Sequence, residues 1–292
     1  MITGTIIKGI GGFYYVKSDE EIYSCRARGK FRKDSLTPMV GDIAEIEITD
    51  FDKKEGYVIK ISPRKNQLIR PLVSNIDLLL VTFAAESPAP SLYLIDKLTV
   101  TAASKNIPTA ICINKCDLNP EIAKEYAQIY TLAGFPVLIV SAETGENVDE
   151  LKILLKNKTT ALAGSSGVGK SSLLNATGES FTLKTGSVSD KIQRGKHTTR
   201  HTELFPLSFG GFVFDTPGFG SYEIENITYH DLPALFPEIK AHEGSCRFSG
   251  CSHVKEPDCS VKDALTSGKI AKSRYENYVT LYEELKKIKE WQ

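Results

Sequence analysis

The chain has 292 residues, a formal net charge of zero and 41% hydrophobic residues. This length allows two or three small domains with apolar cores, and zero net charge excludes a generic polycation but not local phosphate-binding patches. The first residues lack a basic leader with a long apolar run, so no secretion signal is expected. The apolar run at 75–85 is too short to span a bilayer and contains Asp77, so no membrane partner is expected. The six cysteines are therefore expected in a reducing cytosol, which predicts a cytoplasmic protein.

Residues 1–66 are predicted to form a small all-β domain. Alternating apolar and polar runs occur between Gly, Asp and Pro turns, at 4–17, 21–31, 42–50 and 56–63. Short, closely spaced strands favour a five-stranded OB-type barrel, with an SH3-like barrel as the alternative. Residues 64–74 are then expected to be a linker.

From Asn75 onward, predicted strands alternate with predicted helices. The strands are expected at 75–85, 108–115, 135–142, 159–164, 202–208 and 210–218, and the helices at 91–106, 120–134 and 147–157. Such alternation implies a parallel sheet with helices on both faces. This α/β domain is expected to extend over 67–222. Residues 223–292, with a Cys/His segment and a charged helix at 271–291, are expected to form a third domain.

A phosphate-binding loop is predicted between a strand and a helix, where the chain reads G-x-x-x-x-G-K-S. Its glycines let backbone N–H groups turn toward phosphates at a helix N-terminus, where the dipole favours anions. Lys170 is expected to reach the β- and γ-phosphates, and the Ser171 hydroxyl to bind Mg²⁺. The predicted nucleotide contacts here are Gly164, Ser165, Ser166, Gly167, Val168, Gly169, Lys170, Ser171 and Ser172.

An Asn-Lys-x-Asp motif at the end of the 108–115 strand predicts guanine recognition. The Asp117 carboxylate can accept from guanine N1–H and N2–H₂, donors that adenine lacks, so adenine would leave the carboxylate unpaired. Asn114 is expected at the guanine O6/N7 edge, and the Lys115 stem over the ring, while Cys116 fills the variable position. The "VSAETG" segment adds Ser141 and the Ala142 N–H, which is expected to reach guanine O6.

The "DTPGF" segment is expected to complete the nucleotide site, with Asp215 near Mg²⁺ and the Gly218 N–H at the γ-phosphate. Usual GTPase domains carry the phosphate loop before the guanine motif, and here the order is reversed. The strands regain the usual order if the chain is cut after "DTPG" and the old ends are joined through residues 147–162. The α/β domain is therefore predicted to be circularly permuted.

A zinc site is indicated by a C-x₄-C-x-H-x₅-C pattern of Cys246, Cys251, His253 and Cys259. Three thiolates and an imidazole make a closed tetrahedral set, which favours a structural over a catalytic ion. The spacing differs from the common paired C-x₂-C, but four soft ligands within fourteen residues of a cytosolic chain favour a metal over disulfides. His242 lies outside the pattern, and Cys25, Cys112 and Cys116 are expected to be packing residues.

Together these segments resemble the circularly permuted GTPases of small-ribosomal-subunit maturation, the RsgA family. The resemblance covers nearly the whole chain: the N-terminal barrel, "NKCD", "GSSGVGKSS", "RGKHTT", "DTPGF" and the Cys/His cluster. It implies an enzyme that binds GTP and GDP, docks on the small (30S) subunit and its rRNA, hydrolyses GTP there and leaves. It also strengthens the assignment of one structural zinc. We expect a monomer.

Hydrolysis without the subunit is expected to be slow, because Phe219 stands where GTPases commonly have a water-orienting Gln. The polar stretch at 177–204 is where a switch loop belongs. Within it, His197 is the candidate catalytic residue that orients water, with an exposed loop histidine or a phosphate contact as the alternative. Thr198 or Thr199 is expected to join Ser171 and Asp215 around Mg²⁺. Since the chain leaves Gly218 directly for the C-terminal domain, the γ-phosphate is expected to control that domain.

RNA contact is predicted for the basic run around Phe31, where cations with an aromatic suit phosphate contact and base stacking. The run contains Arg26, Arg28, Lys30, Arg32 and Lys33, and the last helix adds Lys286, Lys287 and Lys289. A solvated basic loop is the alternative. Two other functions remain open: a permuted GTPase with a different client, such as the large subunit, and an RNA-binding module whose nucleotide site is structural.

Overall fold

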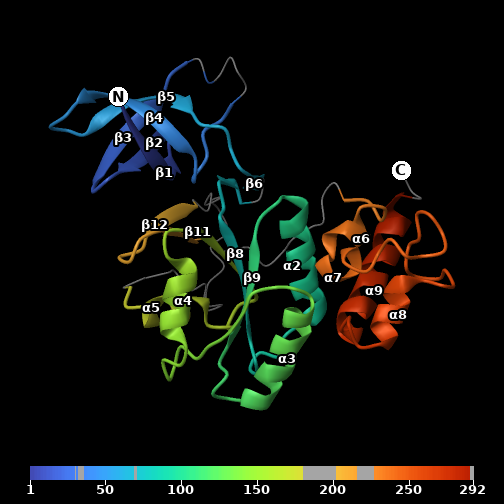
Figure 1. Ribbon diagram of the computed structural model, residues 1–292. Helices are drawn as coiled ribbons and strands as arrows, with labels where there is room; N and C mark the ends of the chain where they lie inside the picture. Colours follow the sequence, from blue (N-terminus) through green and yellow to red (C-terminus); the bar gives the residue numbers. More distant parts are fainter. Residues whose placement is uncertain (30, 32–35, 69–70, 180–201, 216–226, 290–292) are drawn as a thin grey trace, which may run out of the picture. The chain divides into compact units, whose positions relative to one another are not determined.

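The computed structural model describes residues 1–29, 31, 36–68, 71–179, 202–215 and 227–289. The chain divides into two compact units (Figure 1). The first comprises residues 1–78, 154–162 and 179–219, and the second comprises 79–153, 163–178 and 220–292. In the described residues, no helix is both long and apolar enough to cross a membrane.

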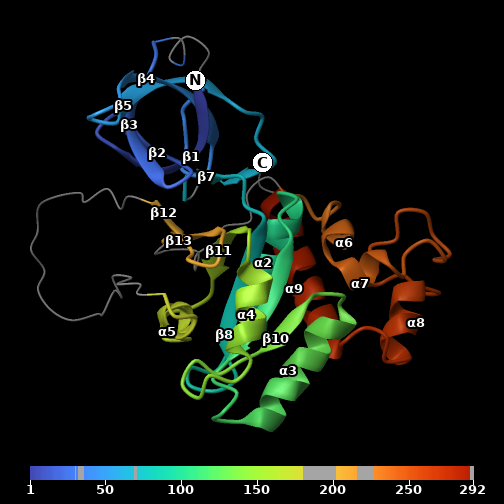
Figure 2. The same ribbon diagram turned by 60° about the vertical axis from the view of Figure 1, so that its left-hand side comes forward.

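A closed five-stranded barrel opens the first unit, as predicted (Figure 2). Its strands pair in the order β1-β2-β3-β5-β4 and close through β1 and β4. All pairs are antiparallel except β3 with β5, which fits an OB-type Greek-key barrel. Alternate side chains fill the interior, among them Ile6, Val16, Cys25, Ala44, Ile46 and Val58. The strands are β1 (Ile2–Ile10), β2 (Phe13–Ser18), β3 (Glu21–Ala27), β4 (Ile43–Asp50) and β5 (Glu55–Ile61).

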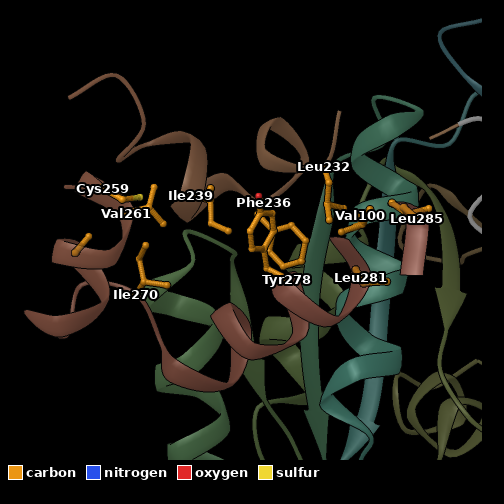
Figure 3. Packing of buried hydrophobic residues seen from close by; sticks show 11 residues of the cluster. Val100, Leu232, Phe236, Ile239, Cys259, Val261, Ile270, Tyr278, Leu281 and Leu285 are labelled. Atoms are coloured by element: carbon orange, nitrogen blue, oxygen red, sulfur yellow. The ribbon is translucent and has the colours of Figure 1, made fainter. Parts of the chain in front are cut away.

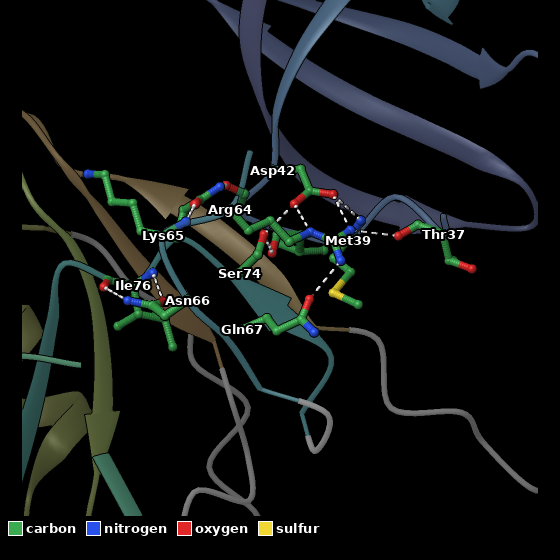
Figure 4. A network of polar contacts seen from close by, with 12 residues as sticks. Thr37, Met39, Asp42, Arg64, Lys65, Asn66, Gln67, Ser74 and Ile76 are labelled. Carbon is green, nitrogen blue, oxygen red and sulfur yellow. Dashed lines mark hydrogen bonds and ion pairs between the residues drawn. The ribbon is translucent and has the colours of Figure 1, made fainter. Parts of the chain in front are cut away.

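The segment expected to be a linker is an ordered hairpin of β6 (Gln67–Leu68) and β7 (Val73–Ser74). A buried ion pair anchors it, because the Arg64 guanidinium donates to both oxygens of Asp42, at 2.7 and 2.8 Å (Figure 4). The Ser74 hydroxyl also donates to Asp42, at 2.6 Å. Gly41 allows the close approach of the barrel to β7. It has φ +96°, and a Cβ there would lie 2.1 Å from the Ser74 carbonyl oxygen.

Three strands of the nucleotide-binding region lie wholly or mainly in the first unit: β11 (Thr159–Ala163), β12 (Glu203–Pro206) and β13 (Phe212–Asp215). β11 pairs with β13 in parallel, as expected. β12 differs from the predicted parallel sheet, because it runs antiparallel to β13 and also pairs with barrel strand β1 at Lys8. Its Glu203 forms a 2.7 Å ion pair with Lys8. The short connection between β12 and β13 makes a hairpin, which requires antiparallel strands.

The second unit contains parallel strands β8 (Leu78–Ala84), β9 (Thr109–Asn114) and β10 (Val137–Ile139). β8 is a continuous buried apolar run, typical of a strand covered on both faces. Side chains of Ser91 and Asn119 cap the N-termini of α2 (Leu92–Ser104) and α3 (Pro120–Leu132). Two more helices, α4 (Val148–Leu155) and α5 (Lys170–Ala176), complete the predicted alternation.

The C-terminal helices are α6 (Leu232–Leu235), α7 (Pro237–Lys240), α8 (Ser260–Thr266) and α9 (Lys272–Lys289). Both ribbon views place α9 beside α2. Their shared core contains Val100 of α2 together with Phe236, Tyr278 and Leu281 (Figure 3). Residues from the middle and the end of the chain therefore share one apolar core within this unit.

Candidate functional site

The predicted phosphate loop connects β11 to α5, and its glycines are required by the backbone. Gly164, Gly167 and Gly169 have φ of +143°, +82° and +91°. A Cβ on Gly164 would lie 2.0 Å from the Thr82 carbonyl oxygen, and one on Gly169 would lie 2.3 Å from Asn114 Nδ2. The loop is therefore held against the ends of β8 and β9.

Lys170 begins α5 and folds back over the phosphate loop. Its Nζ donates to the carbonyl oxygens of Gly164 and Ser165, each at 2.8 Å. Burial lowers the pKa of Lys170 below its ordinary value. Ser171 and Ser172 follow in the first turn of α5, where a helix N-terminus favours anions.

Asn114 joins three loops at the end of β9 and is 1% exposed. Its Nδ2 donates to the Val168 carbonyl at 2.9 Å, and its Oδ1 accepts from the Ala142 N–H at 3.1 Å. The sequence predicted contacts of Asn114 and Ala142 with the guanine edge, whereas in the structure they bond to each other. Asn114 thus holds the guanine motif against the phosphate loop.

Lys115 bridges the same loops from a left-handed backbone conformation, φ +60°. Its Nζ donates to the carbonyl oxygens of Ser87, at 2.5 Å, and Gly167, at 2.9 Å. The 85–90 loop was not among the predicted site segments. Its position after β8 was the available signal, since open α/β sheets bind ligands beyond the carboxyl ends of their strands.

The Asp117 carboxylate is oriented by Ser141, which is fully buried. The Ser141 hydroxyl donates to Asp117 Oδ1 at 2.5 Å and accepts from the Thr144 N–H at 3.1 Å. Cys116 is 3% exposed, and burial together with Glu146 raises the pKa of its thiol to about 11. Cys116 is therefore an inert thiol in the variable position, and Asp117 carries the acceptor.

Several predicted residues lie outside the described part of the chain: His197, Thr198, Thr199, Gly218 and Phe219. Asp215 ends β13, where its backbone is paired with that of Glu203, but its side chain is also outside the description. The Mg²⁺ and catalytic assignments of these residues therefore stay predictions.

The four predicted zinc ligands come together: the ligand atoms of Cys246, Cys251, His253 and Cys259 all lie within 4.8 Å of one another. The Cys246 and Cys259 sulfurs are 3.9 Å apart, and His253 Nδ1 lies 3.4 Å from Cys259 Sγ. Tetrahedral zinc with bonds of about 2.3 Å to sulfur separates two thiolates by about 3.8 Å. The donor set therefore fits zinc, and all six cysteines are free of disulfides. His242 bonds the Glu238 carbonyl through its ring, outside the cluster.

Two cations of the predicted RNA face lie over aromatic rings of the barrel itself. Arg26 lies 4.5 Å over the Phe13 ring, and Arg28 lies 5.9 Å over the Tyr57 ring. Phe31 packs in the barrel core at 8% exposure, so its predicted role in base stacking is wrong. Its apolar ring gains more from the core than from solvent. Lys30, Arg32 and Lys33 lie outside the described residues, and Lys286 and Lys287 are exposed on α9.

Comparisons with known proteins cover nearly the whole chain. Residues 3–58 match the RsgA N-terminal domain, and residues 61–225 match the RsgA GTPase domain. The "Small ribosomal subunit biogenesis GTPase RsgA" of Agathobacter rectalis is 47% identical, with 98% of each chain covered. The protein of the same name from Caldanaerobacter subterraneus is also 47% identical, with 98% of this chain and 96% of that protein covered.

Two solved structures are similar over their full length. One is described as YloQ, a circularly permuted GTPase: it is 38% identical with a TM-score of 0.82, and 98% of this chain and 96% of that chain are covered. The other is YjeQ from Thermotoga maritima, 38% identical with a TM-score of 0.83, covering 97% of this chain and 98% of that chain. The predicted permuted order of the α/β domain is thereby confirmed.

Proposed function

Because the chain belongs to the RsgA GTPase family and is a GTP hydrolase, we propose a client for its activity. On this proposal it acts on the small ribosomal subunit late in the maturation of that subunit. The supporting observation is sequence similarity to proteins named for small-subunit biogenesis, which extends over 98% of this chain. On this proposal the chain binds the subunit and its rRNA, hydrolyses GTP with subunit-stimulated turnover, and leaves in the GDP state. It works as a cytoplasmic monomer.

Guanine is recognised by Asp117, which accepts from N1–H and N2–H₂ of the base. Support comes from Ser141, whose donated hydrogen bond fixes one carboxylate oxygen. The Lys115 stem packs over the ring, and Asn114, Cys116 and Ala142 complete the guanine-binding loops. Because Asn114 and Lys115 both bond the phosphate loop, base and phosphate recognition belong to one site.

The phosphates are bound by residues 164–172, with Lys170 at the β- and γ-phosphates. To reach them, its ammonium exchanges the carbonyl oxygens of Gly164 and Ser165 for phosphate oxygens. An incoming phosphate is favoured because a partly buried lysine gains more from an anion than from neutral carbonyls. Gly218 donates its N–H to the γ-phosphate.

Ser171, Asp215 and one of Thr198 and Thr199 would hold Mg²⁺, which would supply charge neutralisation at the transferring phosphoryl group. His197 accepts a proton from the attacking water and orients it. Phe219 cannot do so, because its ring has no acceptor. Turnover is therefore slow until the small subunit places His197.

Cys246, Cys251, His253 and Cys259 would hold zinc, which would cross-link a loop that has few apolar residues of its own. Four protein ligands would leave no open position on the ion, so its role would be structural. We further propose three functional domains: an RNA-binding barrel at 1–66, the permuted GTPase at 67–222 and the zinc domain at 223–292. Arg26 and Arg28, each over an aromatic ring, support the RNA-binding role of the barrel.

The test measures GTP hydrolysis by zinc-loaded protein alone, with purified small subunits and with purified large subunits. ATP serves as the substrate control, and Lys170→Ala controls for a contaminating hydrolase. We expect stimulation by the small subunit only, no ATP turnover and loss of activity in the variant. Stimulation by the large subunit instead would assign a different client, and no turnover under any condition would contradict a catalytic role.

A further inference from the structure

Arg274 on α9 is buried at 1% exposure and joins two other helices. Its Nη1 donates to Asp96 Oδ1 of α2 at 2.6 Å. Its Nε and Nη2 donate to the two oxygens of Glu238 on α7, at 2.6 and 3.1 Å. Asp96 also accepts from Tyr130 of α3 at 3.1 Å and from Asn277 of α9 at 2.6 Å. One guanidinium thus organises polar groups from four helices.

Aromatic rings surround this guanidinium and keep water out. Its central carbon lies 4.7 Å from the Phe236 ring centroid, 5.5 Å from that of Phe135 and 5.7 Å from that of Tyr130. A buried ion pair costs desolvation that an apolar pair would avoid, so its presence is weak support for stability as such. The ion pair does fix the placement of α9 relative to α2 and α7, because the planar guanidinium must meet both carboxylates at once.

The same helix holds the zinc loop. The hydroxyl of Tyr275 donates to the His253 carbonyl at 2.7 Å, and that of Tyr278 donates to the Ser252 carbonyl at 2.6 Å. Both tyrosines lie within one turn of Arg274. The position of the loop that carries His253 is therefore set by the same part of α9 that is bound to α2.

Asp96 lies close to the nucleotide-binding end of α2. The helix begins after its cap at Ser91, and the loop before that cap contains Ser87. The Ser87 carbonyl accepts from Lys115, which also bonds the Gly167 carbonyl of the phosphate loop. A short run of chain thus separates the Arg274 ion pair from a contact of the guanine motif.

We propose that Arg274 is a positioning residue that couples the zinc loop to the guanine-binding loops through α2. Zinc binding fixes α9, Arg274 fixes α2, and α2 holds the 85–90 loop where Ser87 supports Lys115. Zinc and guanine nucleotide then strengthen each other's binding by the same factor, as linkage requires. The inference rests on the proposed guanine site. It adds a connection between the guanine-binding loops and the C-terminal helices.

The test measures the affinity for a fluorescent GDP analogue with Mg²⁺, in zinc-loaded protein and in protein stripped of zinc under reducing conditions. Zinc affinity is measured in parallel, with and without GDP. In the native chain we expect zinc to tighten GDP binding about fivefold or more, and GDP to tighten zinc binding by an equal factor. A factor of one, with GDP still bound, would overturn the coupling and leave the proposed function intact. Failure of the zinc-loaded native chain to bind GDP would overturn both.

The Arg274→Lys variant keeps the charge but loses the fork that spans Asp96 and Glu238. We expect it to bind zinc, to bind GDP several-fold more weakly than the zinc-loaded native chain, and to show a coupling factor near one. Arg247→Lys is the matched control, because Arg247 pairs with Asp258 on the exposed surface of the same domain. A merely structural role of Arg274 would lower thermal stability and leave the coupling factor at its native value, which would contradict the proposal.

Tyr130→Phe provides a milder variant that decides the matter if Arg274→Lys does not fold. It removes only the hydroxyl that donates to Asp96 and keeps the buried ring. We expect a coupling factor between one and the native value, with unchanged far-ultraviolet circular dichroism. The proposal would be overturned if both Tyr130→Phe and a folded Arg274→Lys kept the native coupling factor. If Arg274→Lys cannot be purified, a native coupling factor in Tyr130→Phe would by itself overturn the proposal.

Discussion

The proposed guanine site depends on very few atoms of this protein. One Asp117 oxygen accepts from Ser141, and the peptide groups around it are held by Asn114 and Lys115. Loops whose positions are fixed in this way reduce the ordering cost of association.

Asp117→Asn is expected to weaken GTP binding about 10- to 100-fold, because the amide presents a donor where guanine also has donors. Xanthine carries a carbonyl at that edge, so the variant should bind xanthosine nucleotides better than the native chain does. Competition between GDP and xanthosine diphosphate, measured by fluorescence, checks this exchange. Cys116→Ala is the neighbouring control and should retain guanine preference.

His197→Ala is expected to lower subunit-stimulated turnover about 10²-fold or more, because a positioned acid-base group contributes that much. GTP affinity should stay close to native, since the residue acts on water. Single-turnover hydrolysis with saturating small subunits separates these effects. His201→Ala is the matched control, and native turnover in His197→Ala would remove this histidine from the mechanism.

At the scale of elements, a buried charge fixes the hairpin of β6 and β7 to the barrel. Asp42 is fully buried, and its oxygens accept from Arg64, Ser74 and the Met39 N–H. Further along this segment, Asp77 exchanges backbone and side-chain hydrogen bonds with Thr159 at the start of β11. The described residues of the 64–77 segment are therefore held by hydrogen bonds at both ends, where the sequence suggested a linker.

Asp42→Ala is expected to destabilise the barrel by about 3 kcal/mol or more, because it leaves the largely buried Arg64 without its partner. Glu45→Ala, three residues further along the chain, breaks an exposed pair with Lys60 and should cost less than about 1 kcal/mol. Hydrogen exchange of barrel peptides in the full chain measures the opening free energy. Equal protection in the two variants would contradict a positioning role for Asp42.

For the molecule as a whole, the permutation sends the chain from Gly218, the proposed γ-phosphate contact, directly toward the Cys/His segment. We expect small-subunit affinity to differ between a non-hydrolysable GTP analogue and GDP, because the γ-phosphate orders the connecting segment. Sedimentation binding at several nucleotide concentrations checks this. Equal affinity in both states would argue against nucleotide control of docking.

Zinc removal is expected to reduce helix content and lower the melting temperature, because Cys259 packs in the core shared by α8, α9 and α2. Zinc affinity should rise with pH, since burial raises the pKa of the Cys251 thiol to about 12 and zinc must displace its proton. Circular dichroism and a zinc-indicator titration at several pH values test both. Lost helicity that zinc does not restore, or affinity independent of pH, would contradict this.

The sequence predicted most of the elements, and it failed where a tertiary contact outweighed local character. Phe31 stands in a basic run that suggests an exposed loop, yet the barrel core takes its ring. β12 was predicted within a parallel sheet, but it forms an antiparallel hairpin with β13. For Asn114 the motif located the residue correctly, and only the fold showed that its amide bonds protein loops.

Residue types at short, fixed spacing were enough to predict the phosphate loop, the guanine motif, the Cys/His set and the permuted order. The contact of Arg274 with Asp96, 178 positions away, and the role of Asp42 as a buried anchor depend on the folded chain. Local periodicity predicts which face of a helix is apolar, but a buried charge is explained only by the partner that the fold brings to it. The proposed connection between the zinc loop and the nucleotide site likewise depends on partners that the fold brings together.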